Sequence, residues 1–196
     1  MKMTKQLIAV LLLAVPCATF AQRDSIRARE AYLEGMAAMH EKKTSVAIDA
    51  FDRATKLDPR SEYFVWLGHA HTRDISTASF IRQPIVARRI RAAYDKAVEL
   101  DSTNVDAAEA RVEYYANAPG IVGGGMDKAR AEAARLKKLH SERGDIALGF
   151  IEEREGRLDA AEGMYKAAIQ AAPDSATRVI GESRLRNLQR KMKTGK

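Results

Sequence analysis

Residues 35–59 read GMAAMHEKKTSVAIDAFDRATKLDP, and a related pattern returns in residues 149–173, GFIEEREGRLDAAEGMYKAAIQAAP. A glycine, two alanines, an aromatic residue and a proline recur after 114 residues: Gly35 and Gly149, Ala47 and Ala161, Phe51 and Tyr165, Ala54 and Ala168, Pro59 and Pro173. Self-similarity at fixed spacing is typical of repeat proteins, in which each unit stacks on the next. The two segments therefore predict the first and last copies of one structural unit.

A second copy lies between these two segments. Its aromatic residue Tyr94 and its alanine Ala97 follow their counterparts by 43 residues, whereas its glycine, Gly68, follows Gly35 by only 33. The difference between these two shifts locates a ten-residue insertion between Gly68 and Ala93.

A third copy keeps the spacing of the others but not their chemistry. Small and large residues are exchanged at three positions, which lie 39 residues after Ile90, Tyr94 and Ala97: Ala129, Ala133 and Leu136. The extra length of this copy falls in the loop Pro119–Gly125.

Each kind of recurring residue has a packing role. Small residues allow two helices to cross closely, a large aromatic ring fills the space between hairpins, and a proline ends the second helix. The spacing resembles the tetratricopeptide repeat, a helix–turn–helix unit of about 34 residues. The resemblance implies an all-α fold, a right-handed α-α superhelix of about four hairpins with a C-terminal capping helix. The repeats are predicted at 28–60, 61–103, 104–138 and 142–174.

The hydrophobic spacing, prolines and glycines predict the individual helices. These are expected at 24–41, 44–57, 61–73, 84–100, 104–117, 126–139, 142–154, 158–171 and 175–192. In the last helix, Ile180, Leu185, Leu188 and Met192 share one face and most other positions are polar or basic. A helix of this kind is typical of the cap that ends a stack of repeats.

The N-terminus has the layout of a secretory signal peptide. Lys2 and Lys5 precede an apolar run over residues 7–15. The small residues Thr19 and Ala21 then occupy the third-last and last positions before the expected cleavage site. We expect cleavage after Ala21, a periplasmic or secreted bacterial protein, and a single domain over residues 22–196. The apolar run is about half of the ~20 residues that a membrane span needs, so no stable span is expected.

Cys17 is the chain's one cysteine and lies inside the predicted signal peptide. Pro16 directly before it disfavours lipidation, because a lipidated cysteine normally follows a small residue such as glycine or alanine. The processed chain would then hold no disulfide and no cysteine nucleophile.

In tetratricopeptide-repeat proteins the first helix of each repeat lines a concave groove, and the resemblance implies partner contacts there. The candidates are aromatic, apolar and basic residues of the first, second and fourth copies: Tyr32, Met36, Met39, His40, Val65, His69, Arg73, Ile146, Phe150 and Arg154. Such a mixture suits an extended peptide or a partner helix. The alternative is that the C-terminal helix of the chain itself fills much of this face.

Two segments fall outside the repeat pattern. The insertion brings apolar residues together within 75–86 (Ile75, Phe80, Ile81, Ile85 and Val86), which predicts either packing over the edge of the stack or self-association. The loop Pro119–Gly125 predicts a flexible or tightly folded connection, with anion binding at the following helix start as the alternative. This loop is also similar to one in the T-component lipoproteins associated with TRAP-type transporters.

No constellation for catalysis is found. His69 and His71 are two residues apart, so they lie on different helix faces and predict no metal site. No Gly-x-Ser-x-Gly motif occurs, and the acids are scattered among lysines and arginines. We therefore expect no enzyme, no cofactor and no metal.

The net charge of +7 and a pI near 9.6 favour acidic partners, anionic lipid headgroups or cell-wall polymers. Predicted export, and the lack of aromatic residues among the basic cluster near Arg88, argue against nucleic acid. The sequence thus predicts a non-catalytic scaffold or adaptor of the bacterial envelope that binds a protein or peptide in its groove. The alternative is an accessory subunit of periplasmic solute uptake that binds a small ligand or a solute-binding protein.

Overall fold

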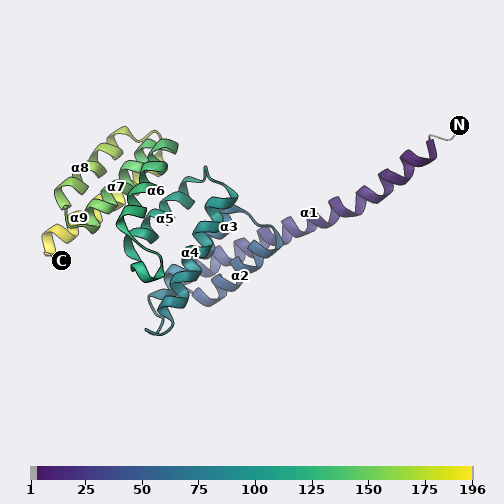
Figure 1. Ribbon diagram of the computed structural model, residues 1–196, viewed down its shortest axis with the longest axis horizontal. Coiled ribbons are helices and arrows are strands. Elements are labelled where there is room, and N and C mark those ends of the chain that lie inside the picture. The colour runs from purple at the N-terminus through teal and green to yellow at the C-terminus, as the bar shows by residue number, and fades with distance from the viewer. Residues whose placement is uncertain (1–3, 196) are drawn as a thin grey trace.

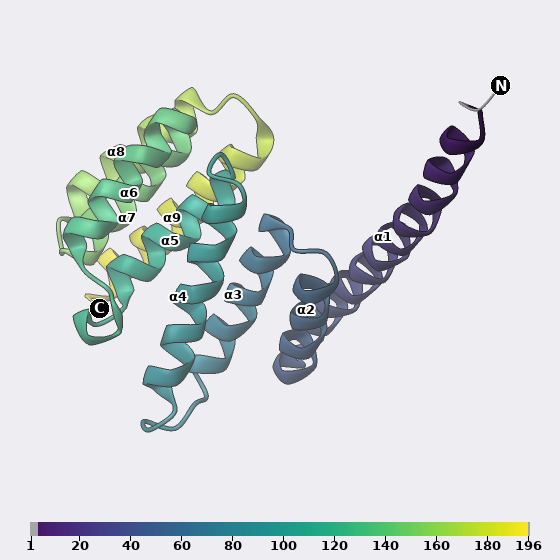
Figure 2. The same ribbon diagram turned by 45° about the vertical axis from the view of Figure 1, so that its right-hand side comes forward.

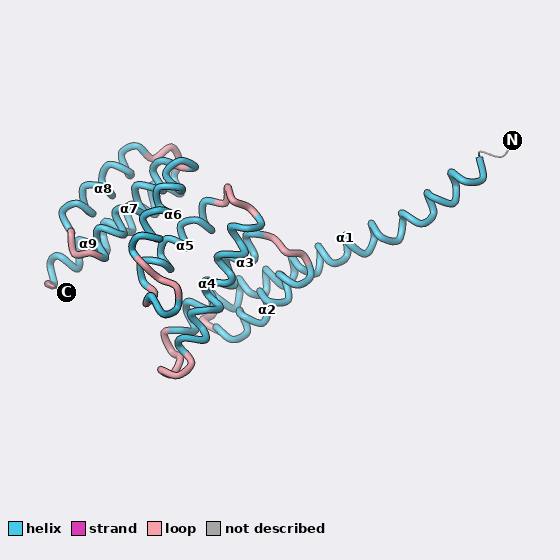
Figure 3. The backbone as a smooth tube through the Cα atoms, in the orientation of Figure 1, coloured by secondary structure: helices cyan, strands magenta, loops and turns pink. Residues whose placement is uncertain are grey.

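The computed structural model describes residues 4–195, and it describes the side chains of residues 21–195. This part of the chain contains helices and loops and no strand (Figures 1 and 3). The helices are α1 (Thr4–His40), α2 (Thr44–Leu57), α3 (Ser61–Ile75), α4 (Gln83–Leu100), α5 (Val105–Asn117), the 3-10 helix η1 (Gly120–Val122), α6 (Met126–Leu139), α7 (Ser141–Arg154), α8 (Leu158–Ala171) and α9 (Ser175–Thr194). The predicted all-α fold is confirmed.

Successive helices pair as antiparallel hairpins. The pairs α1/α2, α3/α4, α5/α6 and α7/α8 pack side by side in chain order, and α9 packs on α8 and α7 (Figures 1 and 2). Helix α1 extends beyond α2 towards the N-terminus (Figure 1). The predicted signal peptide falls mostly in this extension. Residues 1–3 and the side chains through Phe20, including Cys17, lie outside the described part, so cleavage after Ala21 stays a prediction.

In the first, second and fourth copies, the recurring glycine and the recurring aromatic residue lie against each other inside one hairpin. The pairs are Gly35 with Phe51, Gly68 with Tyr94, and Gly149 with Tyr165. A Cβ atom on Gly35 would stand 2.6 Å from the Phe51 ring, and one on Gly149 would stand 2.8 Å from the Tyr165 ring. All three rings are buried. The recurring pair is therefore a close contact in which only glycine leaves room for the ring.

In the core of the third hairpin the sizes are reversed. Its first helix contributes Val112 and its second contributes Ala133, and both are fully buried in one core cluster with Ala129 and Leu136. Exchanging large and small residues between facing helices preserves the packed volume. This exchange explains why the third copy resembles the others poorly in sequence.

Helix α9 has the packing expected of a cap. Leu188 is fully buried against Ile146 and Tyr165, and Ile180 and Leu185 pack against the same cluster. Asp174 caps the start of α9, where its carboxylate accepts a hydrogen bond from the Thr177 backbone amide at 2.7 Å. The outer surface of α9 is basic and exposed, so the helix ends the stack without leaving an apolar face.

The loop between α5 and α6 is tightly folded. The Tyr114 hydroxyl donates to the Val122 carbonyl at 2.7 Å, and the Gly125 amide donates to the Tyr115 carbonyl at 2.8 Å. Gly123 has a φ of 99°, a left-handed conformation that glycine adopts at little cost. Of the two connections predicted here, the structure shows the tightly folded one.

Candidate partner-binding groove

The first helices of the last three hairpins and α9 enclose a hollow of about 310 Å³. We call this hollow the groove. Its lining comes from α3, α5, α7 and α9: Val65, Trp66, His69, Asp106, Glu109, Ala110, Glu113, Arg143 and Ile180.

One wall of the groove carries the rings of Trp66 and His69, which belong to a longer aromatic series whose Tyr63, Phe51 and Tyr94 rings are buried. Six rings form a continuous series in the order Tyr63, Tyr32, Phe51, Trp66, His69 and Tyr94, with successive centroid distances of 4.9, 5.9, 6.2, 5.4 and 5.7 Å. Trp66 is half-buried and shares a core cluster with Tyr32, Met36 and Met39 of α1. The aromatic wall therefore continues from the groove onto α1, where three of the predicted contact residues lie.

The opposite wall carries an ion network. Asp106, Glu109 and Glu113 occupy one face of α5, because residues three and four apart are neighbours on a helix. Arg143 of α7 donates to Glu109 through Nε at 2.7 Å and to Asp106 through a terminal nitrogen at 2.7 Å. Arg184 of α9 pairs with Glu113. The network joins three helices across the groove.

Burial and the neighbouring carboxylates act in opposite directions on the charges of this network. The side chains of Arg143 and Glu109 are each 11% exposed. Burial opposes the charge of Arg143, but the carboxylates of Glu109 and Asp106 outweigh it and raise the pKa of the guanidinium. Burial lowers the pKa of Arg184, an effect that Glu109 partly offsets. Three carboxylates face two guanidinium groups, so this wall carries a net negative charge although the whole chain is at +7.

The hydrogen bonds around His69, which lines the groove, assign its tautomer. The Thr72 hydroxyl donates to the Gly68 carbonyl at 2.9 Å, so it accepts from the Tyr94 hydroxyl at 3.2 Å. Tyr94 then accepts from Nδ1 of His69 at 3.0 Å, which assigns the proton to Nδ1. Burial lowers the pKa of His69, against the influence of Asp106, and burial raises the pKa of Tyr94 to about 12. Neutral His69 thus keeps Nε2 as a hydrogen-bond acceptor.

The predicted contact residues divide into open and covered groups. Tyr32, Met36, Met39 and His69 are partly exposed along the aromatic wall, and His40, Arg73 and Arg154 are exposed. Val65 is buried in the floor of the groove.

The fourth-copy part of the predicted surface is covered by α9. Ile146 is only 1% exposed and belongs to the core under α9, so it offers no contact surface. Phe150 is also buried, and the Arg184 guanidinium stands 4.8 Å from the centre of its ring. Both alternatives for this face therefore hold in part: α9 covers Ile146 and Phe150 of the fourth copy, whereas Arg154 and the candidates of the first two copies other than Val65 stay at least partly exposed.

Sequence reasoning missed the residues that close the groove. These are Trp66, Asp106, Glu109, Glu113, Arg143 and Arg184. The acids of α5 carry a usable signal, because positions i, i+3 and i+7 share a helix face. The altered third copy hid the register that would have assigned this face to the groove.

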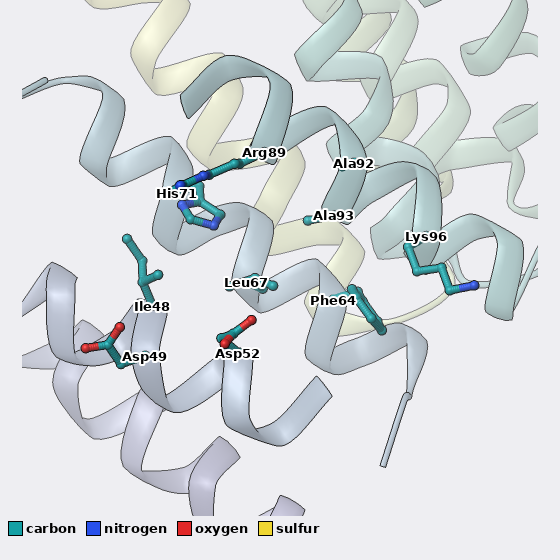
Figure 4. Close-up of a pocket in the computed structure, with 10 residues that line it drawn as sticks. All are labelled: Ile48, Asp49, Asp52, Phe64, Leu67, His71, Arg89, Ala92, Ala93 and Lys96. Atoms are coloured by element: carbon teal, nitrogen blue, oxygen red, sulfur yellow. The ribbon is translucent and has the colours of Figure 1, made fainter. Parts of the chain in front are cut away.

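A second hollow of about 690 Å³ lies between α2 and α4, with α3 beneath it (Figure 4). Asp49 and Asp52 come from α2, whereas Arg89 and Lys96 come from α4, so the two walls differ in charge (Figure 4). His71 lines this hollow at 6% exposure, and its Nδ1 has no hydrogen-bond partner among the described residues. Burial lowers the pKa of His71, and the nearby Arg89 lowers it further.

Lowering the pH from about 7.5 to about 5.5 is expected to reduce the free energy of unfolding through His69 and His71. Both histidines have a lowered pKa when folded, so the unfolded chain, titrating near pH 6.5, binds protons first. The stabilisation that the two neutral histidines provide is complete above about pH 6.5. It is lost as the pH falls below this value, by at most about 1.4 kcal/mol per pH unit for each histidine. Urea unfolding followed by circular dichroism measures the slope. The H69Q/H71Q variant should flatten it, and an equally steep slope in that variant would contradict the assignment.

No protein-family profile and no curated protein sequence matches the chain. Its fold is similar to that of YrrB, described as a TPR protein with an unusual peptide-binding site, with a TM-score of 0.52 and 18% identity over 91% of this chain and 88% of that one. The thermophilic TPR protein TTC0263 of Thermus thermophilus gives a TM-score of 0.46 and 19% identity over 81% of this chain and 98% of that one. Yeast Tom70 gives a TM-score of 0.39 and 16% identity over 87% of this chain and 41% of that one. The likeness to YrrB confirms the predicted tetratricopeptide-repeat fold.

Proposed function

We propose that the protein is a non-catalytic interaction scaffold whose groove holds an extended peptide segment of a partner protein. The observation that carries the proposal is the pairing of the partly exposed rings of Trp66 and His69 with an ordered ion network around one hollow. A tetratricopeptide-repeat fold supports it, and so does the likeness to YrrB, whose peptide-binding site is part of its description. The mechanism is shape complementarity with modest electrostatics.

The chemistry of the two walls defines the peptide. Apolar side chains would pack on Trp66 and Tyr32, where flat rings offer contact area at small entropic cost. A basic side chain would approach Asp106, whose side chain is 69% exposed although it bonds Arg143. His69 also lines the groove, and an acceptor Nε2 on its ring would suit a backbone amide or a hydroxyl donor. We therefore expect an apolar stretch next to a lysine or arginine.

A photo-crosslinking residue at Met36, which lies beside the groove where the aromatic series continues onto α1, tests the site, with the same residue at Ala167 on exposed α8 as the control position. Met36 should capture a partner, and mass spectrometry of the crosslinked peptide should identify an apolar stretch beside a basic residue. Capture from Ala167 alone, or a crosslinked peptide without these features, would contradict the proposal.

Trp66→Ala is expected to weaken binding of the captured segment by about thirtyfold, because a truncated aromatic anchor typically costs about 2 kcal/mol. Asp106→Asn should weaken it by a smaller factor, and Ala167→Gln should leave it unchanged. Titration of a synthetic peptide of the captured sequence measures all three. Equal affinities for the W66A and A167Q variants would remove the aromatic wall from the proposed site.

The proposed location is the bacterial envelope, supported by the order of Lys2, Lys5 and the apolar run over residues 7–15. Within the described residues, no helix combines the length and the apolar character of a membrane crossing. The accessory role in solute uptake remains the alternative. A thermal-shift screen of small solutes separates the two, because a ligand raises the melting temperature of the state that it binds.

A further inference from the structure

Three large apolar side chains stand almost fully in solvent at the tips of two loops. Phe80 and Ile81, between α3 and α4, are 87% and 83% exposed, and Ile121 of η1 is 87% exposed. We call these three residues the apolar tips. Exposure of this degree is uncommon for large apolar residues that gather at one place, and it marks an interaction surface.

The rest of the insertion is anchored, so the tips do not belong to a loose loop. Ala78 and Val86 are buried in a core cluster with Tyr94, and Ile75 packs against it. The prediction that the insertion packs over the edge of the stack thus holds for its two ends. Its centre, with Phe80 and Ile81, points away from the core.

Both loops lie at the same edge of the stack (Figures 1 and 2). Helix η1 contacts α4, the helix that follows the insertion. A Cβ atom on Gly123 would meet the Arg91 guanidinium, so the end of η1 lies directly against α4. Tyr114 belongs to the core cluster under the insertion and bonds the Val122 carbonyl. One cluster therefore holds both loops in a fixed relation.

The segment that carries Phe80 and Ile81, together with the start of α4, is positively charged. Residues 76–94 contain four arginines and no acid. All four are exposed: Arg82, Arg88, Arg89 and Arg91. Arg82 pairs with Asp74 at 3.5 Å and Arg91 with Asp95 at 3.2 Å, whereas Arg88 and Arg89 have no carboxylate partner among the described residues. Lys128 adds a further cation beside Gly123.

We propose that this edge docks on an anionic lipid bilayer, with the apolar tips entering the interface and the arginines contacting the headgroups. Apolar side chains and a basic cluster together provide the two signals that stable peripheral binding requires. A second copy of the chain is a poorer occupant. A symmetric dimer through this edge would place each arginine cluster against its own copy, and like charges repel.

Site-specific quenching tests the insertion with the full chain. In the W66F/F80W variant the one tryptophan stands at the tip, whereas in the unmodified chain it stands in the groove. Vesicles of phosphatidylglycerol and brominated phosphatidylcholine should quench the tip tryptophan strongly and Trp66 weakly. Vesicles of brominated phosphatidylcholine without phosphatidylglycerol should quench neither tryptophan strongly. Because both proteins keep the same N-terminal apolar run, a difference in quenching between the tip tryptophan and Trp66 reports on this edge.

Charge and apolar variants complete the test. R88E/R89E and F80D/I81D should each lower vesicle affinity by at least about tenfold, and both should keep the parent circular dichroism spectrum because they alter exposed positions. Equal quenching of Trp66 and the tip tryptophan would overturn the proposal. So would a dimer, measured by light scattering without lipid, that F80D/I81D converts to a monomer.

Discussion

Replacing Phe51 with alanine is expected to lower the free energy of unfolding by about 4 kcal/mol. Phe51 is fully buried and faces Gly35, which has no side chain to move into the vacated space. A cavity that cannot collapse places the cost in the upper part of the range for aromatic-to-alanine changes. Because each repeat contacts only its neighbours, the loss should appear first as faster amide exchange in α1 and α2.

The Gly35→Ala change supplies the matched control. In the unmodified chain its new Cβ would stand 2.6 Å from the Phe51 ring, so we expect a cost of about 2 kcal/mol from overpacking. In the F51A background the same Cβ enters the vacated space, and its cost should vanish or change sign. Urea unfolding of the two single variants and the double variant measures the coupling. Additive costs would show that the glycine and the ring do not share one contact.

Replacing Arg143 with methionine is expected to destabilise the protein by about 3 kcal/mol. The change leaves Glu109 at 11% exposure without the guanidinium that neutralises it, and an unpaired buried charge is expensive. The double variant E109Q/R143M removes that charge and should regain most of the lost stability. Asp106 is mostly exposed and should contribute little to either variant.

Urea unfolding at low and high salt measures these differences. The cost of R143M should change little with salt, because screening acts weakly on buried charges. A double variant as unstable as R143M would show that Arg143 stabilises through packing and not through Glu109. R143M also tests the groove, because it removes the guanidinium that holds the Asp106 carboxylate in place.

Much of the fold follows from local patterns in the chain. Helix α8 is found at the predicted residues 158–171, and α3 extends only two residues beyond the predicted 61–73. Apolar spacing, prolines and caps act within a few residues, so they can be read without knowing the partner of a helix. The third copy is the exception, because in its core the usual sizes are reversed, with Val112 on the first helix and Ala133 on the second.

The candidate groove could be predicted only in part. Val65 and His69 follow from the position of the first helix in each repeat, a relation within one hairpin. The pairing of Arg184 with Glu113 joins residues 71 apart, and it places α9 over Phe150. No local pattern encodes that approach, because it depends on how successive hairpins rotate relative to one another.

The sequence by itself determined that the chain forms helical hairpins, where most of its helices end, and at which positions its small residues and aromatic rings recur. Each of these results from steric exclusion and apolar burial between segments close in the chain or related by a fixed period. Only the tertiary structure decided that α9 covers the fourth copy, that an ion network closes one wall of the groove, and that Phe80 and Ile81 stay in solvent. Exposure and ion pairing depend on the summed rotations of all the hairpins, so no single repeat contains that information.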